Sequence, residues 1–467
     1  MYVQNMEVTV QLIDTHCHLD FPQYKEDLDD VVKRAVSSGV IRMIVPGTDA
    51  GSSREAVELA QRYQDVFAAV GIHPHGADKS RASDMADLRN MAVTRDKVVA
   101  VGEIGLDHYK GYSSPENQQR LFRSCLSLAS ELDLPVIMHN RDADEDFLGI
   151  LKEQGPFKVK GVVHCFSGGR ELLKEILALG LYVSFAGNIT FDKAGDLKML
   201  AEKVPPERLL LETDSPFLSP KPFRGQRNEP AYVGRVLDLY AEMHGLSPAD
   251  MARITTHNAN QLFKLGVEKR NTIAYPIRDS LYLNITYRCT NRCSFCIRDA
   301  TDYVKGHDLK LDKEPTVGQV IEAMGDVTKY KEIVFCGYGE PTLRLNVVTE
   351  VAKYVKSRGG RLRLITNGEG NLISGRNIVP DLDNYFDRIS VSLNAPSAAE
   401  YDRLCRSVFG EKAFEGILDF IRECRKGDIN IEVTCLDAAG EKVVTKCHQI
   451  TDVLGAEFRL RRLDVVG

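Results

Sequence analysis

The sequence predicts an α/β protein in which an N-terminal (β/α)8 TIM barrel is followed by a C-terminal (β/α)6 partial barrel. Length is the first reason, because 467 residues exceed what one ordinary hydrophobic core holds. The second reason is a rhythm of short β-rich runs separated by helical stretches, with eight runs in the first half and six in the second. The composition, 43% hydrophobic and 27% charged, is typical of a globular protein.

The chain divides into a first domain at residues 8–265, a linker at 266–278 and a second domain at 279–467. The linker is indicated by the charged run Glu268-Lys269-Arg270 and by Pro276. No stretch approaches the ~18–20 apolar residues that cross a bilayer. The first seven residues lack the basic and apolar regions of an export signal. We therefore expect a cytoplasmic protein with no membrane contact.

Charge and cysteine content exclude two further classes. A net charge of −6 is not that of a protein that coats nucleic acid with a broad basic surface. Eleven cysteines in a non-exported chain are expected as reduced thiols or metal ligands, not as a disulfide framework. Any recognition of phosphate must therefore depend on local groups inside a site.

Polar side chains stand at the ends of five of the eight predicted strands of the first domain. The predicted strands are residues 11–14, 42–45, 66–72, 98–104, 135–139, 161–165, 181–186 and 209–213. Because the carboxyl ends of barrel strands meet at one mouth, side chains far apart in sequence are expected to lie together there. They are His16, His18, Glu103, His139, His164 and Asp214.

These side chains suit a site for two metal ions. His16 and His18 are two residues apart, which places both on the same side of a strand, where they can hold one ion. A single carboxylate, Glu103, can bridge two ions roughly 3.5–4 Å apart, with His139 and His164 completing the second. The alternative, that these histidines are structural, is weak for groups that all stand at strand ends of one barrel.

Asp214 ends the eighth predicted strand, where it can bind the first ion and orient or deprotonate the attacking water. Asp214 and the bridging Glu103 are thus the predicted catalytic residues. Four groups near the same mouth are candidate contacts to substrate phosphate: His73, Arg141, Arg224 and Arg227. Arginine can clamp phosphate in a planar fork. For Arg224 and Arg227 an ordinary surface arginine is an equal alternative.

The motifs that carry these residues cover residues 10–265 in order. They are Asp14-Thr15-His16-Cys17-His18-Leu19-Asp20, Gly71-Ile72-His73-Pro74-His75, Gly102-Glu103-Ile104-Gly105-Leu106-Asp107, His139-Asn140-Arg141, His164-Cys165-Phe166-Ser167-Gly168, Glu212-Thr213-Asp214-Ser215-Pro216 and Arg224-Gly225-Gln226-Arg227-Asn228-Glu229-Pro230.

With these motifs the segment resembles the TatD family of metal-dependent deoxyribonucleases. The resemblance implies that the six strand-end side chains are the metal ligands and that the substrate is a DNA phosphodiester. A small nucleotide or oligonucleotide would fit a local phosphate site as well. The two ions are expected to be Mg²⁺, Mn²⁺ or Zn²⁺, of which Mg²⁺ prefers oxygen ligands and the others tolerate histidine. His108 is a departure, since the family more often has an aromatic residue there.

The second domain begins with a three-cysteine motif after its first predicted strand. The six predicted strands are residues 281–287, 332–336, 361–366, 388–393, 430–434 and 457–463. Cys289, Cys293 and Cys296 have the spacing C-x3-C-x2-C. Three thiolates leave one iron of a [4Fe–4S] cluster open for a cosubstrate. Zinc is the weaker alternative, because it needs a fourth ligand and usually paired C-x2-C motifs.

Later motifs agree with the cysteine motif in order. They are Cys336-Gly337-Tyr338-Gly339-Glu340-Pro341, Thr366-Asn367-Gly368 and Ser390-Val391-Ser392-Leu393-Asn394. With them, this half resembles the radical S-adenosylmethionine (SAM) superfamily. The resemblance implies one [4Fe–4S] cluster, SAM, and an electron donor such as flavodoxin or ferredoxin. The implied SAM-binding residues are Phe295, Gly337, Gly339, Glu340, Ser392 and Asn394. The Gly-Tyr-Gly-Glu-Pro run alone could be an ordinary strand-to-helix turn.

Together these features predict a bifunctional fusion of a two-metal phosphodiesterase with a radical SAM enzyme. Two alternatives stay open. The first domain could be a C–N amidohydrolase, because the same barrel and ligand types serve both reactions. The second domain could be a non-catalytic SAM- or cluster-binding regulator of the nuclease.

Overall fold

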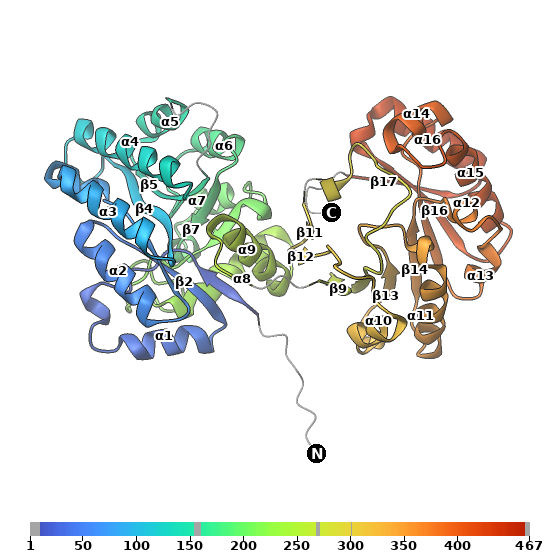
Figure 1. Ribbon diagram of the computed structural model, residues 1–467, viewed down its shortest axis with the longest axis horizontal. Helices are drawn as coiled ribbons and strands as arrows, with labels where there is room; N and C mark the ends of the chain where they lie inside the picture. Colours follow the sequence, from blue (N-terminus) through green and yellow to red (C-terminus); the bar gives the residue numbers. More distant parts are fainter. Residues whose placement is uncertain (1–9, 154–159, 268–270, 300, 463–467) are drawn as a thin grey trace, which may run out of the picture. The chain divides into compact units, whose positions relative to one another are not determined.

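The computed structural model describes residues 10–153, 160–267, 271–299 and 301–462. The chain forms two compact units, residues 1–268 and 269–467 (Figure 1). In the part of the chain that is described, no helix is long and apolar enough to cross a membrane. Residues 8–9 of the predicted first domain, residues 268–270 of the predicted linker and residues 463–467 lie outside the described residues.

The first unit is a barrel of eight parallel strands, each paired with the next one in sequence. Contacts between residues at or just past the ends of the first and the last strand close the barrel. The Thr15 N–H donates to the Leu211 carbonyl at 2.9 Å, and Cys17 pairs with Ser215 in a parallel bridge. The predicted (β/α)8 fold is confirmed. The strands are β1 (Leu12–Asp14), β2 (Val40–Pro46), β3 (Val66–Val70), β4 (Val98–Asp107), β5 (Val136–Arg141), β6 (Gly161–Val163), β7 (Tyr182–Phe185) and β8 (Leu209–Leu211).

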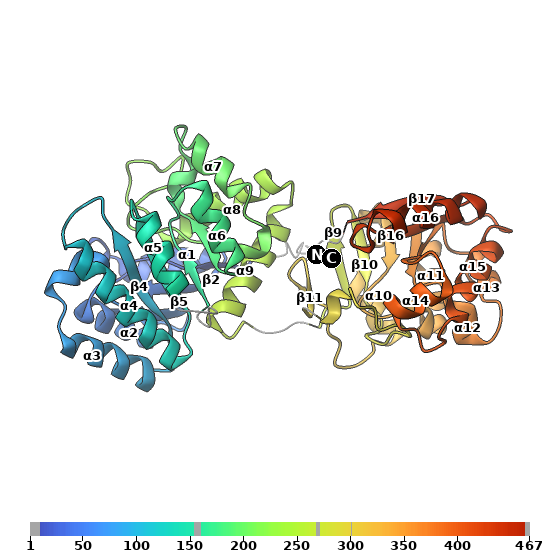
Figure 2. The same ribbon diagram turned by 90° about the horizontal axis from the view of Figure 1, so that it is seen from above.

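Helices cover the outside of this barrel (Figures 1 and 2). They are α1 (Leu28–Ser37), α2 (Ala50–Arg62), α3 (Ala82–Thr94), α4 (Pro115–Leu132), α5 (Asp144–Glu153), α6 (Arg170–Ala178), α7 (Gly195–Ala201), α8 (Val233–His244) and α9 (Pro248–Phe263). Two of them begin at a Ser-Pro pair. Ser114 and Ser247 each accept a backbone N–H of the first turn, where the following proline is also tolerated.

Helix α9 lies at the end of the barrel where the strands begin. Its Thr256 hydroxyl donates to the Gln11 carbonyl at 2.8 Å, and the Asn258 amide donates to the Leu209 carbonyl at 2.9 Å. An apolar layer from seven strands packs against the end of this helix and Leu265; its strand members are Ile13, Ile44, Ala69, Val99, Ala100, Ile137, Val162 and Leu210. The opposite end of the barrel, where the strands finish, is therefore left for polar side chains.

The second unit contains a seven-stranded sheet in the order β17-β16-β15-β14-β13-β10-β9. Its six parallel strands are the six that the sequence predicts, and the predicted partial barrel of α/β type is confirmed. The strands are β9 (Ala274–Ile277), β10 (Ser280–Leu283), β13 (Glu332–Phe335), β14 (Leu362–Thr366), β15 (Arg388–Ser392), β16 (Asn430–Leu436) and β17 (Glu457–Arg461), beside a hairpin of β11 (Tyr303–Val304) and β12 (His307–Asp308).

Strand β9 corrects the predicted linker, which includes its residues. It forms the antiparallel edge of the sheet and pairs with β10. The two strands are joined by Arg278 and Asp279, and Arg278 has a left-handed φ of 55°. Such a tight turn is normally marked by glycine or asparagine, so this hairpin gave no turn signal. Pro276 fits an edge strand, where a missing N–H is tolerated.

Alternation along the strands separates a core face from a polar face. Ile389 and Val391 of β15 belong to the apolar core, whereas Ser390 and Ser392 face the other way. The helices of this unit are α10 (Val317–Met324), α11 (Leu345–Ser357), α12 (Gly370–Ser374), α13 (Val379–Asp383), α14 (Ala398–Cys405), α15 (Lys412–Cys424) and α16 (Glu441–Val453). The second face of the sheet thus carries the polar groups available for a ligand.

Candidate active sites

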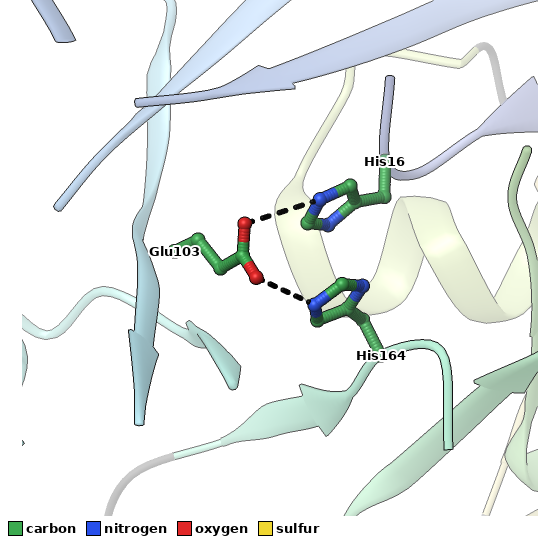
Figure 3. Close-up of side chains that lie close together, drawn as sticks. All are labelled: His16, Glu103 and His164. Atoms are coloured by element: carbon green, nitrogen blue, oxygen red, sulfur yellow. Dashed lines mark hydrogen bonds and ion pairs between the residues drawn. The ribbon is translucent and has the colours of Figure 1, made fainter. Parts of the chain in front are cut away.

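The two carboxylate oxygens of Glu103 face two groups of histidines. Oε1 lies 2.9 Å from Nε2 of His164 and 3.1 Å from Nδ1 of His139. Oε2 lies 3.5 Å from Nε2 of His16 and 3.7 Å from Nε2 of His18. Figure 3 shows the rings of His16 and His164 at different oxygens of this one carboxylate. The buried Glu103 side chain thus has the arrangement of a carboxylate that bridges two ions.

Asp214 joins the His16–His18 side of this site. The Nε2 atoms of the two histidines are 3.2 Å apart, and Oδ1 of Asp214 lies 3.8 and 3.7 Å from them. Asp214 has a left-handed φ of 54°, and its N–H donates to the His16 carbonyl at 2.9 Å. A residue other than glycine held in this region of φ is often found at functional sites. The backbone here places the carboxylate among the histidines.

His73 lies closer to the ligand set than the sequence suggests. Its Nε2 is 3.4 Å from Oε1 of Glu103. Three groups of donor atoms could each hold an ion, with all atoms of a group within 4.8 Å of one another: His16, Glu103 and His164; His16, His18 and Asp214; and His73, Glu103 and His139. His73, predicted as a substrate contact, is therefore placed among potential ligands. Its position directly after the third strand was the available signal.

Two carboxylates support histidine rings from behind and a third holds the His16 backbone, and none of the three has a role among the sequence-based predictions. Oδ2 of Asp107 lies 3.2 Å from Nε2 of His139, and Oε2 of Glu212 lies 3.7 Å from Nδ1 of His164. Asp14 instead accepts the backbone N–H of His16 at 3.2 Å. Carboxylates beside ring nitrogens, as Asp107 and Glu212 are, orient ligand rings and raise their basicity. All three stand in the quoted motifs, but only the fold shows which histidine each one contacts.

The electrostatics of the site fit divalent cations. Burial lowers the pKa of His18 to about 3 and also lowers that of His16, so both rings are neutral and offer lone pairs. Burial alone would raise the pKa of Glu103, but the charges of His164 and His73 hold it well below its usual value. Burial opposes protonation of His164, but Glu103 and Glu212 raise its pKa well above the usual value. A bound cation would replace that proton.

The predicted arginines differ in what they contact. The Arg141 guanidinium lies 3.8 Å from the centre of the Tyr109 ring, and that of Arg224 lies 4.5 Å from the Phe191 ring centre. Arg227 is instead paired with carboxylates. Its two terminal nitrogens each lie 2.7 Å from an oxygen of Asp27, and a further bond of 3.0 Å reaches Glu229. The fork of Arg227 is thus already engaged within the protein.

Three exposed aromatic side chains follow the strands that carry the ligands. Tyr109 and Tyr112 come after β4 and are 57% and 63% exposed, and Phe217 comes after β8 and is 45% exposed. Phe217 lies edge-on to His18, with ring centres 6.5 Å apart. Tyr112 lies edge-on to His75 at 4.7 Å. The barrel mouth therefore presents aromatic faces to solvent beside the candidate metal ligands.

In the second unit, the three-cysteine motif forms a loop after β10. The N–H groups of Arg292 and Ser294 donate to the Cys405 and Leu404 carbonyls, each at 2.9 Å, which fixes the loop against the end of α14. All three cysteines, Cys289, Cys293 and Cys296, are half-buried and free of disulfides. The Asn291 N–H also points at the Cys289 sulfur, 3.4 Å away. Three reachable thiols on one fixed loop, with a backbone donor to sulfur, fit an iron–sulfur cluster.

The two glycines after β13 are required by close backbone contact. A Cβ on Gly337 would lie 2.4 Å from Oδ1 of Asn284. A Cβ on Gly339 would lie 2.4 Å from the carbonyl oxygens of Thr286 and Arg288. Without side chains, this segment runs against the chain that leads into the cluster loop. Its backbone is therefore placed beside the cysteines.

Glu340 has its carboxylate engaged inside the protein. The hydroxyls of Thr342 and Thr366 donate to it, each at 2.7 Å, and so does the Asn367 N–H at 2.7 Å. This buried carboxylate joins the β13 and β14 loops and fixes the glycine segment. At the end of β15, Oδ1 of Asn394 accepts the Leu436 N–H at 3.3 Å. The remaining predicted SAM contacts also lie in this unit: Ser392 ends β15, and Phe295 packs against the core.

Comparison with known proteins agrees with both halves. The family model described as TatD related DNase matches residues 13–264, and the Radical SAM superfamily model matches residues 283–438. The first half is 42% identical over 254 residues to the uncharacterized metal-dependent hydrolase YabD of Bacillus subtilis, covering 54% of this chain and 99% of that protein. It is 37% identical over 261 residues to the 3′-5′ ssDNA/RNA exonuclease TatD of Salmonella typhimurium, covering 54% of this chain and 99% of that one.

A solved structure gives the same result for the fold. The crystal structure of YJJV, a TatD homolog from Escherichia coli K12, superposes with a TM-score of 0.52 at 35% identity over 55% of this chain and 99% of that chain. Both resemblances inferred from the sequence motifs are confirmed, and both halves fall in enzyme families. The chain therefore belongs to the TatD related DNase family, and a radical SAM domain is fused to its hydrolase half.

Proposed function

We propose that the chain is a bifunctional enzyme. Its first half is a two-metal phosphodiesterase for single-stranded nucleic acid, and its second half is a radical SAM enzyme with one [4Fe–4S] cluster. The observation that carries the hydrolase assignment is the placement of Glu103, whose two oxygens face separate histidine groups. A single cation site would need only one of those groups.

The residues that would hold the two ions are those grouped around Glu103: His16, His18, Glu103, His139, His164 and Asp214. Ions bound there activate water and neutralise charge on the attacking and leaving oxygens of a phosphodiester. A donor set dominated by histidine favours Mn²⁺ or Zn²⁺ over Mg²⁺, which prefers oxygen ligands. His73 is the further donor at this centre, 3.4 Å from Glu103.

The protein side chains have separate roles in this reaction. Burial raises the pKa of Asp214 to about 7, so its carboxylate is suited to accept a proton from the attacking water. Glu103 stays ionised because of the histidines around it. Arg141 ends β5, two residues after His139, and is the arginine best placed to contact the substrate phosphate. Arg227 is assigned a structural role, because Asp27 and Glu229 occupy its guanidinium.

The exposed aromatics support a nucleic-acid substrate over an amide. Base–aromatic stacking contributes ~1–3 kcal/mol per base and is the usual way to hold single strands. Tyr109, Tyr112 and Phe217 supply such faces at the barrel mouth, whereas hydrolysis of a small amide requires none. Relatives 37–38% identical to the first half are named as 3′-5′ ssDNA/RNA exonucleases, which supports the same substrate class and cleavage from the 3′ end.

A side-by-side assay tests the hydrolase assignment. The purified chain is incubated with Mn²⁺ and single-stranded DNA labelled at its 3′ or its 5′ end, and separately with a panel of N-acyl compounds. We expect rapid release of the 3′ label, stepwise shortening of the 5′-labelled strand and no amide turnover. Amide turnover without DNA cleavage would establish the C–N hydrolase alternative.

For the second half, Cys289, Cys293 and Cys296 would hold the cluster. A cluster with three protein ligands leaves one iron for SAM and supplies the electron for its cleavage. The Gly337–Gly339 backbone runs against the residues that lead into the cysteine loop, and this supports its assignment to SAM binding. Anaerobically reconstituted protein with a reductant should convert SAM to methionine and 5′-deoxyadenosine. A fully loaded cluster that yields no 5′-deoxyadenosine would favour the regulatory alternative.

A further inference from the structure

A cavity of about 420 Å³ opens beside the cysteine loop. Its lining residues are Arg292, Cys293, Ser294, Arg298, Asp299 and Arg406. Half of them are arginines, and one is a predicted cluster ligand. We call it the arginine cavity. Its position raises the question of what an arginine-lined surface beside a redox group would bind.

The arginines of this cavity are not neutralised by the protein. Arg298 donates to the Tyr287 carbonyl at 2.9 Å. Among the described residues, none of Arg292, Arg298 and Arg406 forms an ion pair, although Asp299 lines the same cavity. Several other arginines of this unit are paired, as Arg288 is with Glu314 at 2.8 Å. The cavity therefore presents positive charge that is available to a partner.

The arginine cavity and the predicted SAM segment contact the chain around the cysteine loop through different residues. Gly339 packs against the carbonyls of Thr286 and Arg288, which precede Cys289. The cavity is instead lined by residues that follow Cys289 and by Arg406, at the end of α14. A ligand in the cavity would thus contact the cysteine loop at Cys293.

An exposed apolar residue lies beside this charge. Val408, two residues after Arg406, is 71% exposed. Its N–H donates to the Thr290 carbonyl at 3.0 Å, so the segment is fixed against the cysteine loop. Exposed charge around a small apolar contact is typical of weak, electrostatically steered protein encounters. Arg292 and Arg406 are themselves exposed, which suits a macromolecular surface better than a small enclosed anion.

We propose that the arginine cavity is the docking site of a small acidic electron-transfer protein. This proposal rests on the proposed function of the second half. In the step that follows docking, the flavin or iron–sulfur group of the carrier is oxidised by one electron and the cluster is reduced by one. No atom is transferred. The positive cavity attracts the acidic carrier and holds it next to Cys293.

Two charge reversals test the proposal, Arg292→Glu and Arg406→Glu, with Arg358→Glu as the matched control. Arg358 is an exposed arginine after α11 that does not line the cavity. The readout is the rate at which the cluster absorbance bleaches when a purified acidic flavodoxin in its hydroquinone form is added. The same rate is measured with photoreduced deazaflavin, a small reductant that needs no docking site. Circular dichroism and iron content confirm that each variant is folded and loaded.

At low salt, each cavity variant should be reduced by flavodoxin about tenfold more slowly than the wild type, because electrostatic steering alone changes association rates by 10-fold or more. The wild-type rate should fall as salt rises, and reduction by deazaflavin should be unchanged in every variant. Wild-type rates with flavodoxin in both variants would overturn the proposal. Loss of SAM binding and slower reduction by both reductants would instead assign the arginine cavity to a small anion. A wild-type chain that assembles no cluster would refute the proposed function itself.

Discussion

Asp107 and Glu103 hold the His139 ring from opposite edges. Oδ2 of Asp107 lies 3.2 Å from Nε2, and Oε1 of Glu103 lies 3.1 Å from Nδ1. Burial would raise the pKa of Asp107, but hydrogen bonds from His139 and the Lys110 N–H hold it below its usual range. An ionised Asp107 that accepts the Nε2 proton leaves the Nδ1 lone pair directed at the metal centre.

Asp107→Asn should weaken metal binding by about 10- to 100-fold, because the ring loses the charge that orients it and raises its basicity. Titration of metal-free protein with Mn²⁺, followed by nuclease assays, measures both effects. Asp78→Asn is the matched control, since the Asp78 carboxylate accepts the Ser114 N–H and the Asn117 side-chain amide at the start of α4. Equal Mn²⁺ affinity in wild type and Asp107→Asn would show that Asp107 does not position the ligand.

Glu103→Gln should reduce bound Mn²⁺ or Zn²⁺ from two ions to one or fewer per chain. A glutamine amide has only one acceptor oxygen and no charge, so it cannot serve both histidine groups at once. DNA hydrolysis should fall at least about a hundredfold, beyond the loss expected for a supporting residue. Elemental analysis after gel filtration gives the stoichiometry, with the exposed Glu202→Gln as control. Retention of two ions would disprove the bridging role of Glu103.

The strand-end side chains were predictable because barrel topology converts sequence position into spatial position. Once eight strands were counted, His16, Glu103 and Asp214 had to meet at one mouth. The strand β9 was not predictable, since Arg278 occupies a turn position that glycine or asparagine usually marks. The sequence pattern around residues 274–283 therefore gave no signal for this hairpin.

The contacts of individual side chains could not be predicted from the sequence where the partner residue is distant along the chain. Arg227 pairs with Asp27, 200 residues away, so its engagement is visible only in the fold. The same applies to Glu212, which lies behind His164, and to Glu340, which is saturated by Thr366 and Asn367. Sequence motifs identified the chemistry of each group, whereas the direction of each side chain required the structure.

Tyr112→Ala and Phe217→Ala should each raise KM for single-stranded DNA by about 5- to 150-fold, the effect of losing ~1–3 kcal/mol of base stacking. Turnover of a small phosphodiester such as bis-p-nitrophenyl phosphate should change little, because it has no base stack to place. Met199→Ala, at an exposed residue of α7, controls for loss of surface area. Equal losses on both substrates would assign the two rings to the metal site instead.

Gly339→Ala should abolish SAM binding, because the new methyl group would stand 2.4 Å from two backbone oxygens that cannot move without displacing the cysteine loop. Gly318→Ala is the matched control. Gly318 lies inside α10 with nothing closer than 4.0 Å to a new Cβ, and alanine there should stabilise the helix by roughly 0.5–1 kcal/mol. Equilibrium dialysis with labelled SAM, after reconstitution of the cluster, measures the SAM affinity of both variants. Wild-type SAM affinity in Gly339→Ala would contradict the close packing.

Arg227→Ala should mainly lower the stability of the fold, whereas Arg141→Ala should mainly raise KM for DNA. Arg227 bonds to Asp27 and Glu229, so its loss should lower the free energy of unfolding. The loss should be only ~1 kcal/mol, because the partners are partly exposed. KM for DNA should not change. Arg141 stacks on Tyr109 without an ion pair in the part of the chain that is described, so its loss should raise KM and leave Tm nearly unchanged. Thermal unfolding and steady-state kinetics distinguish them.

The Arg227 effect should also depend on pH. Hydrogen bonds from Arg227 and Arg34 lower the pKa of Asp27 to about 2, below its value of ~3.9 in an unfolded chain. The stabilisation is therefore fully present above pH ~4 and is lost as the pH falls toward 2. The Tm difference between wild type and Arg227→Ala should shrink over that window. A difference that persists unchanged at pH 3 would contradict Asp27 as the source of the stabilisation, whereas a rise in KM without loss of stability would return Arg227 to the substrate site.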